Sequence, residues 1–177
     1  MSLVVVGIAD CQVSSEPAAV LVTYALGSCI ALLVHDPVAK VAGMLHYMLP
    51  ESSLDPAKAE KNPYMFADTG IPRLFHAIYR LGGEKRRLVV TAVGGAQVMD
   101  REGTFNIGKR NHLAMRKILW KSGVLLQNED VGGAVSRTVR LEARTGKIML
   151  RRAEEPEQEL IKPSSAGKGV SECHSQF

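Results

Sequence analysis

The sequence predicts an α+β fold, because strand-forming runs, helices and hairpins follow one another without the regular alternation of parallel βαβ units. The first half is rich in β-branched residues, two amphipathic segments lie in the middle, and further strands follow. The 177 residues, 46% of them hydrophobic and 23% charged, are sufficient for one globular domain with a buried core. We expect this single domain to span residues 1–162.

The first half contains apolar runs bounded by turn-forming residues, and such runs are typical of strands. These runs are 4–8, 20–23, 29–34 and 41–49. Residues 51–63 then change to Ser, Asp, Pro, Lys and Asn without periodicity. This composition predicts a long exposed loop of the kind that borders a site.

Two helices with a strand between them are predicted in the middle of the chain. The first helix covers 68–81, and its apolar residues repeat at helical spacing on one face. That face comprises Ile71, Leu74, Phe75 and Ile78. A strand over 88–93 follows, and the second helix begins at Asn106 as N-cap and ends at Gly123. The buried stripe of the second helix comprises Ala114, Met115, Ile118 and Leu119.

The last third predicts short strands and then a tail. Strands are expected at 124–126 and over the alternating series 135–141, and 144–147 forms a hairpin turn into a strand at 148–150. Residues 163–177 are rich in Ser, Gly and Lys and have little to bury, so we expect a disordered C-terminal tail.

Charge and cysteine usage exclude several classes of function. A formal charge of +4 and an aromatic content of 5% do not favour a nucleic-acid surface. The segment 103–110 resembles a phosphate-binding loop but lacks the final Ser or Thr, so nucleotide binding is not favoured. The three cysteines, Cys11, Cys29 and Cys173, form no metal-binding or disulfide pattern, so we expect no cofactor and no metal. No signal peptide or membrane-inserting segment is recognisable, which predicts a cytoplasmic protein.

A hairpin over residues 27–46 suggests a catalytic pair. A turn centred between Pro37 and Val38 places Cys29 opposite His46, with both side chains on one face of the sheet. His35 lies six residues along the same strand from Cys29, roughly 20 Å away, and is not favoured as a partner. The alternative for Cys29 is that of a small buried hydrophobic residue, since free cysteine is often buried.

The pair suggests nucleophilic catalysis. A neighbouring imidazolium is expected to lower the pKa of the Cys29 thiol and so to supply a thiolate. The backbone N–H groups of Gly27, Ser28 and Cys29 are candidate donors to an oxyanion. The hydroxyl of Thr23, on the preceding strand, is a candidate to orient the second ring nitrogen of His46.

These residues resemble the CheD family of chemoreceptor glutamine deamidases. The best-matching segments read TYALGSC at 23–29 and GMLHYMLP at 43–50. Further segments that appear in the family's order are 36–37, 64–69, 94–96, 106–111, 129–133 and 145–147. The resemblance covers residues 3–152 and puts the family's catalytic cysteine, histidine and threonine on Cys29, His46 and Thr23.

The resemblance implies a fold and an activity. The implied fold is that of cysteine hydrolases related to toxin deamidases, with mixed β-sheets packed together and helices on the outside. The implied reaction is hydrolysis of glutamine amides on methyl-accepting chemotaxis receptors through a Cys29 thioester, with methylesterase activity in some members. A CheC-type phosphatase is an implied partner, and no cofactor is implied. The alternative is a non-enzymatic adaptor that binds and regulates that phosphatase.

Overall fold

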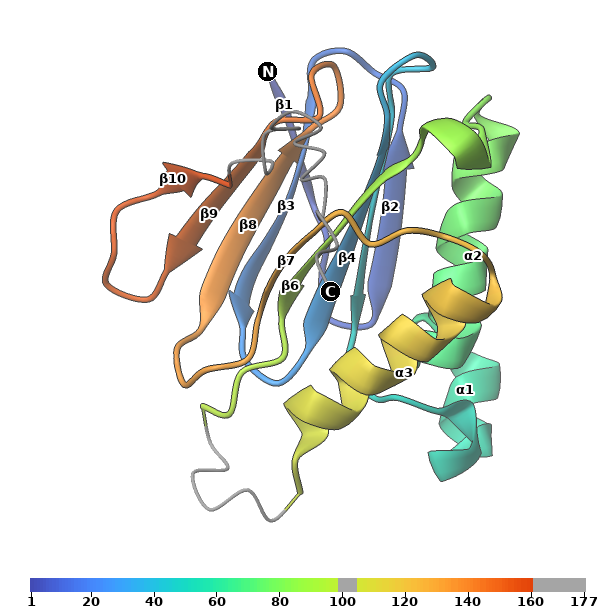
Figure 1. The fold of residues 1–177 in the computed structure, drawn as a ribbon, viewed down its shortest axis with the longest axis vertical. Helices are drawn as coiled ribbons and strands as arrows, with labels where there is room; N and C mark the ends of the chain where they lie inside the picture. The colour runs from blue at the N-terminus through green and yellow to red at the C-terminus, as the bar shows by residue number, and fades with distance from the viewer. Residues whose placement is uncertain (99–104, 161–177) are drawn as a thin grey trace, which may run out of the picture.

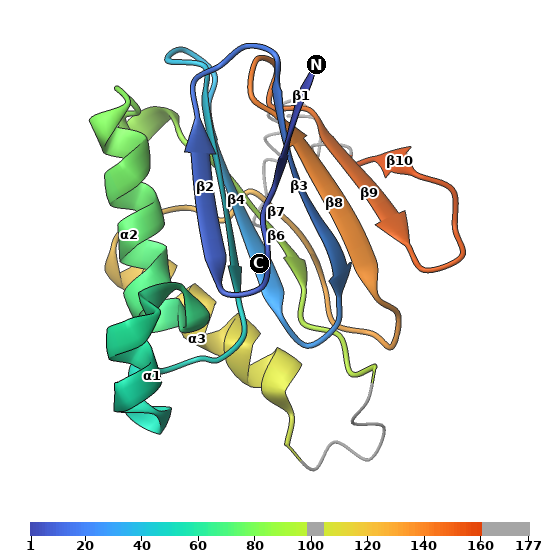
Figure 2. The same ribbon diagram turned by 180° about the vertical axis from the view of Figure 1, so that it is seen from behind.

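The computed structural model describes residues 1–98 and 105–160, which form two β-sheets and a layer of helices (Figures 1 and 2). The first sheet has five strands in the order β1-β3-β8-β9-β10. Their bounds are Ser2–Val5, Ala19–Leu26, Arg137–Glu142, Ile148–Arg152 and Gln158–Glu159. Strand β1 is parallel to β3, and the remaining neighbours are antiparallel, so this sheet is mixed.

The second sheet also has five strands, in the order β2-β5-β4-β6-β7. Their bounds are Asp10–Ser14, Val41–Tyr47, Ile30–Asp36, Val89–Gly94 and Asn128–Val131. Here β7 is parallel to β6 and the other pairs are antiparallel. Each sheet therefore combines hairpins with one parallel edge pair, as the α+β expectation requires.

The helices lie on the outer face of the second sheet, away from the first sheet (Figure 2). They are α1 over Pro56–Lys61, α2 over Ala67–Arg80 and α3 over Ile107–Lys121. Short 3-10 turns occupy Ser52–Leu54, Pro63–Met65 and Lys85–Arg87. In the parts of the chain described above, no helix is long and apolar enough to cross a membrane.

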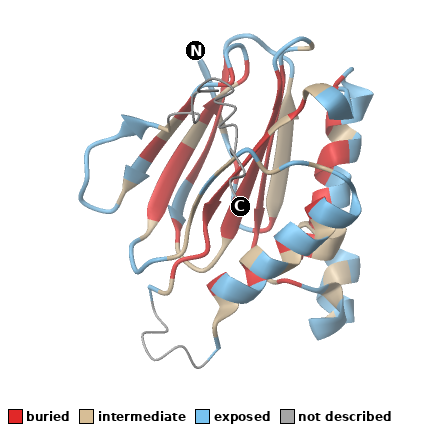
Figure 3. Cartoon of the chain, in the orientation of Figure 1, coloured by how far each residue is buried: buried red, intermediate tan, exposed pale blue. Residues whose placement is uncertain are grey.

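Two hydrophobic cores lie on opposite faces of the second sheet. The outer core joins residues such as Ile30, Leu32 and Tyr47 to the apolar faces of α2 and α3. The inner core joins Leu33 and Met44 to the facing side chains of the first sheet. Every residue of β4 and β5 is consequently buried, which Figure 3 shows as two red strands in the centre of the molecule. Strands covered on both faces are expected to be nearly continuous apolar runs, as these are.

Several expectations for individual elements are confirmed. Helix α2 covers the expected segment within a residue at each end, and its predicted apolar face is buried. Helix α3 begins directly after Asn106, which lies at the N-cap position. The Asn106 side chain does not cap the helix, however; its Oδ1 accepts a hydrogen bond from Gln97 Nε2 at 2.7 Å. In the predicted stripe of α3, Met115 and Leu119 are fully buried, while Ala114 and Ile118 are half-buried.

Other expectations are wrong, for local reasons. The predicted loop at 51–63 contains α1, where the Asp55 side chain accepts from the Lys58 N–H and Pro56 occupies the first helical position. Strand β2 was not expected, because its half-exposed residues lack an alternating pattern. Residues 124–126 form no strand, since Val124 N–H ends α3 by bonding to Leu119 O. The predicted tail at 163–177 and the boundary at 162 lie outside the described residues.

Candidate active site

The turn of the β4–β5 hairpin is centred one residue later than predicted. Asp36 pairs with Val41, so the turn holds residues 37–40, and Ala31, not Cys29, lies opposite His46. The Asp36 carboxylate stabilises this turn, because it accepts from the N–H groups of Val38 and Ala39 at 2.9 and 3.0 Å. The prediction that Cys29 faces His46 directly is therefore wrong.

The wrong pairing does not change which residues share a face of the sheet. The residue opposite His46 moves by two positions, from 29 to 31, and side chains in a strand alternate with a period of two. Met44 lies two residues before His46 in β5 and belongs to the inner core, and Cys29 packs against that same core. The thiol and the imidazole thus lie on the same face of the second sheet, as diagonal neighbours between the two sheets.

His46 is held from the opposite sheet by Thr23. Thr23 Oγ1 and His46 Nδ1 are 2.8 Å apart, and the two residues are 1% and 2% exposed. Just beyond Thr23, the register between β3 and β8 shifts, and Ala25 adopts a left-handed φ of 52°. This β-bulge inverts the alternation of β3, so Leu26 also points into the inner core. The bulge ends the regular strand next to the segment that carries Cys29.

The segment 27–29 is held by hydrogen bonds to each of its carbonyl groups. Gly27 O accepts from Ala96 N and Cys29 O from Gly95 N, both at 2.8 Å. Ser28 O accepts from the side-chain Nδ2 of Asn111 at 3.0 Å. The backbone of this segment is therefore fixed in one conformation.

The close approach behind Cys29 depends on glycine. Gly94 has a φ of 118°, and a Cβ there would collide with the carbonyl oxygen of Cys29. Gly108, in the first turn of α3, leaves no room for a Cβ against the backbone of Gly95. These two glycines let β6 and α3 pack directly against the backbone around Cys29.

Burial determines the charge state of the pair. Burial raises the pKa of the Cys29 thiol above its ordinary value of 9.0, with the backbone amide of Cys29 itself opposing this. Burial also lowers the pKa of His46 to about 4, against a smaller opposing effect of Asp10. The expected imidazolium–thiolate pair is therefore wrong for this structure, in which both groups are neutral at pH 7.

A neutral imidazole is the form that can accept a proton. The Nε2 atom of His46 is buried and makes no hydrogen bond with any residue the structure describes, the Cys29 thiol included. When Nδ1–H donates to Thr23 Oγ1, Nε2 carries the free lone pair of a base. Hydrogen bonds between catalytic groups often tighten only when substrate binds.

Cys29 opens into an apolar pocket of about 620 Å³, within the size range of small-ligand sites. The pocket lies at the end of the sheets where α3 begins, and small or apolar residues line it. They are Ala25, Gly27, Ser28, Cys29, Ala96, Gln97, Val98, Phe105, Ile107, Gly108 and Ser136. The half-buried thiol is therefore accessible from the surface, while His46 behind it is not.

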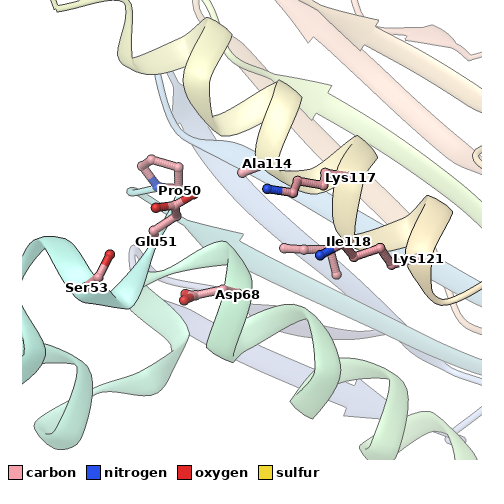
Figure 4. A pocket seen from close by; sticks show the side chains of 8 residues that line it. All are labelled: Pro50, Glu51, Ser53, Asp68, Ala114, Lys117, Ile118 and Lys121. Atoms are coloured by element: carbon pink, nitrogen blue, oxygen red, sulfur yellow. The ribbon is translucent and has the colours of Figure 1, made fainter.

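A smaller pocket of about 220 Å³ lies between the start of α2 and the middle of α3 (Figure 4). Glu51 and Asp68 face Lys117 and Lys121 across it. The carboxylate of Asp68 already accepts from the backbone and hydroxyl of Ser52. No cysteine or histidine lines this pocket, and the described ranges contain no cluster of metal-ligating side chains.

The other histidines within the described residues have contacts that explain them without a catalytic role. His35 is buried at the turn end of the hairpin, where Nε2 is 3.0 Å from Ala143 O. His112 pairs with Glu129 at 2.8 Å on the outside of α3, and His76 stacks edge-on against Tyr79. Cys173 lies outside the described residues.

Asn111 was not among the predicted site residues, although it lies within the matching segment 106–111. The signal was its position one turn before Met115, on the buried stripe of α3. An amide on an apolar stripe needs hydrogen-bond partners inside the protein.

The chain was compared with known proteins. A family model described as CheD chemotactic sensory transduction matches residues 48–152. A relative from Solibacter usitatus, named probable chemoreceptor glutamine deamidase CheD, is 54% identical over 169 residues, which are 96% of this chain and 99% of the relative. A relative from Syntrophus aciditrophicus is 51% identical over 90% of this chain and 100% of its own length.

A third relative, from Thermotoga maritima, is named chemoreceptor glutamine deamidase CheD. It is 40% identical over 89% of this chain and 97% of its own length. The match of the family model and the near-complete coverage of these relatives agree with each other. The chain belongs to the CheD family.

Proposed function

We propose that this chain is a chemoreceptor glutamine deamidase, a cysteine hydrolase that converts receptor glutamines to glutamates and releases ammonia. The names of the curated relatives support the reaction and the class of substrate. The observation that carries the proposal is the arrangement of Thr23, His46 and Cys29. Thr23 holds Nδ1 of His46 at 2.8 Å, and His46 shares a sheet face with the cysteine at the floor of the pocket.

In the first half of the reaction, the Cys29 sulfur attacks the carbonyl carbon of the glutamine side chain. The thiol proton passes to Nε2 of His46, which is neutral at pH 7 and can accept it. The resulting oxyanion accepts hydrogen bonds from backbone N–H groups of the 27–29 segment. His46 then returns the proton to the leaving nitrogen, so that ammonia departs and a thioester remains.

In the second half, His46 accepts a proton from water, and the hydroxide oxygen attacks the thioester carbonyl. The carbon–sulfur bond breaks and the proton returns to sulfur, which restores the Cys29 thiol and leaves a glutamate. Thr23 keeps the imidazole in one orientation through both halves. No step requires a group beyond the protein, the glutamine and water.

The pocket favours a side chain presented by a protein surface. Its apolar lining includes Phe105, which is 69% exposed, and Val98, which is 38% exposed. Apolar residues at the edge of a pocket favour a protein partner, because they can bury surface against it. We propose that receptor helices bind at this pocket in the cytoplasm. We also propose that Cys29 hydrolyses receptor methyl esters and that the chain binds a CheC-type phosphatase.

The test is ammonia release from purified chemoreceptor cytoplasmic fragments. Cys29→Ala is expected to lower the rate by at least about a thousandfold, because the nucleophile is removed. Cys11→Ala is the matched control; the Cys11 thiol is half-buried and its pKa is raised to about 12 by burial and by Asp10. Its rate should equal that of the unmodified protein.

Equal ammonia release from the Cys29→Ala variant and the unmodified protein would remove Cys29 from the mechanism. If neither protein releases ammonia while both bind the receptor fragment or a CheC-type phosphatase, the non-enzymatic adaptor is the correct function. Mass spectrometry that locates a gain of about one dalton at a receptor glutamine distinguishes deamidation from ester hydrolysis.

A further inference from the structure

We infer that Asn111 is a positioning residue of the active site: its side-chain amide orients the peptide unit between Ser28 and Cys29, and with it the N–H group that stabilises the oxyanion. This inference rests on the proposed deamidase function. It adds a third element, α3, to a site that otherwise comes from the two sheets.

The side chain of Asn111 joins two backbone carbonyls. Nδ2 donates to Ser28 O at 3.0 Å and to Met48 O at 2.7 Å. Ser28 lies just before β4 and Met48 just after β5, where the two strands separate and no longer pair. The two hydrogens of one amide thus replace the strand pairing at the end of the hairpin that carries the site.

The amide is held firmly by α3. Asn111 is 0% exposed, and its own carbonyl accepts from the hydroxyl of Tyr47 at 3.0 Å. Its Oδ1 is buried without a partner among the residues described, so the two bonds from Nδ2 are the bonds that the side chain makes there. The two hydrogen bonds from Nδ2 therefore offset the cost of burying the Asn111 amide.

The geometry of the peptide bond connects Asn111 to catalysis. Ser28 C=O and Cys29 N–H belong to one planar trans unit, so they point in opposite directions. With the carbonyl held against α3, the N–H of Cys29 is directed the other way, toward the thiol side. The influence of this amide on the Cys29 thiol pKa agrees with that direction. Rotation of this peptide unit would turn the donor away from the oxyanion.

The neighbouring peptide units are fixed by other groups. Ala96 N–H holds the Gly27 carbonyl and Gly95 N–H holds the Cys29 carbonyl. The Ser28 carbonyl lies between these two and is held by the side chain of Asn111. A substitution of Asn111 can therefore free the peptide unit between Ser28 and Cys29.

The test compares Asn111→Leu and Asn111→Ala with the unmodified protein. Leucine has a similar volume and donates nothing, and alanine removes the amide altogether. We expect kcat for ammonia release to fall by about a hundredfold, as for the loss of one oxyanion donor, with KM changed less than about threefold. Alkylation of Cys29 by iodoacetamide requires no oxyanion, and its rate should stay within about threefold.

Met115→Ala is the matched control, because it creates a cavity on the same buried stripe of α3 without touching the Ser28 carbonyl. Its kcat should stay near that of the unmodified protein at a temperature where all variants are folded. Should the leucine variant not fold, the alanine variant decides alone.

The inference is overturned if kcat in a folded Asn111 variant stays within about threefold of the unmodified protein. It is also overturned if the alkylation rate falls in parallel with kcat, since Asn111 would then only keep Cys29 in place. A failure of the proposed function has a different signature, namely a Cys29→Ala variant that still releases ammonia at the full rate.

Discussion

The two ends of the β4–β5 hairpin each carry a buried histidine, and they use it differently. His35 and His46 are 3% and 2% exposed, and both have a ring nitrogen within hydrogen-bond distance of an oxygen in the first sheet. The oxygen near His35 belongs to the backbone of Ala143, and that near His46 to the hydroxyl of Thr23. The two histidines are therefore buried to a similar extent and differ in their hydrogen-bond partners and in the groups around them.

At the turn end, a buried carboxylate paired with a partly exposed arginine holds the structure together. The Asp36 carboxylate is 0% exposed; it bonds to Arg87 and accepts from the Glu84 N–H, besides making the two turn bonds. The His35 ring packs against Gly146, where a Cβ would collide with it. At the other end, the thiol of Cys29 lies beside a pocket and the imidazole keeps a nitrogen for chemistry. The difference shows that a buried histidine can serve as a base when an accessible nucleophile lies on the same sheet face, as Cys29 does for His46.

The largest expected change in activity comes from replacing His46, whereas the same replacement of His35 should affect only stability. His46→Gln should lower kcat for ammonia release by on the order of 10²- to 10⁴-fold, because the general base is lost. His35→Gln should lower the melting temperature and leave kcat per folded molecule unchanged. Steady-state assays and thermal unfolding of both variants make the comparison. Equal activity losses in the two would break it.

At the turn end, Asp36→Ala should lower the free energy of unfolding by about 3–5 kcal/mol, because it removes the acceptor of three backbone N–H groups and the partner of the partly exposed Arg87. Activity per folded molecule should persist. Urea unfolding and an assay at a temperature below the transition measure both. A large loss of kcat in the folded variant would show that the two ends are coupled.

Acid should act through His46. The unfolded chain protonates this group near the ordinary value of 6.5, whereas burial lowers its folded pKa to about 4. Between these values the unfolded state binds more protons, so stability is fully present above pH 6.5 and falls as the pH drops toward 4, with a slope of up to about 1.4 kcal/mol per pH unit. Urea midpoints at pH 7 and pH 5 should differ more in the unmodified protein than in His46→Gln. An identical pH dependence would contradict the assigned shift.

Thr23→Val keeps the shape of the side chain and removes its hydroxyl. One hydrogen bond to Nδ1 is worth about 1 kcal/mol, which corresponds to roughly a fivefold change in rate if it is lost in the transition state. We expect kcat to fall by that factor and Thr23→Ser to retain most of it. A serine variant as slow as the valine variant would mean that packing, not the hydroxyl, matters.

The smallest effect belongs to Lys40, the exposed last residue of the turn, with a left-handed φ of 53°. Lys40→Gly should raise stability by about 0.5–1 kcal/mol, because glycine adopts this conformation without strain. The activity should not change. A decrease in the urea midpoint would show that the lysine side chain contributes more than its backbone strain costs.

Local sequence patterns predicted most helices and strands, but they did not predict which distant strands pair with each other. Helix α2 and strands β4 to β6 follow from apolar periodicity and turn residues. The pairing of β3 with β8 joins segments more than a hundred residues apart, and nothing local specifies it. The half-exposed edge strand β2 carries no hydrophobic alternation from which it could be recognised.

The site was predicted in part for an instructive reason. The predicted centre of the turn was wrong by one residue, which moves the residue opposite His46 by two positions. A shift of two preserves the strand face, so Cys29 and His46 still share one. The charge state was wrong, because sequence gives spacing and not desolvation. Asn111 was missed because its two carbonyl partners come from the ends of two different strands.

The complete coverage of β4 and β5 on both faces limits where natural variation can occur. The centres of these strands admit little except apolar side chains of matching size, whereas the pocket residues Val98 and Ser136 lie outside both strands. For protein engineers, this means that libraries at these two pocket positions should keep the fold and change selectivity, whereas libraries at the strand centres should mostly lose stability.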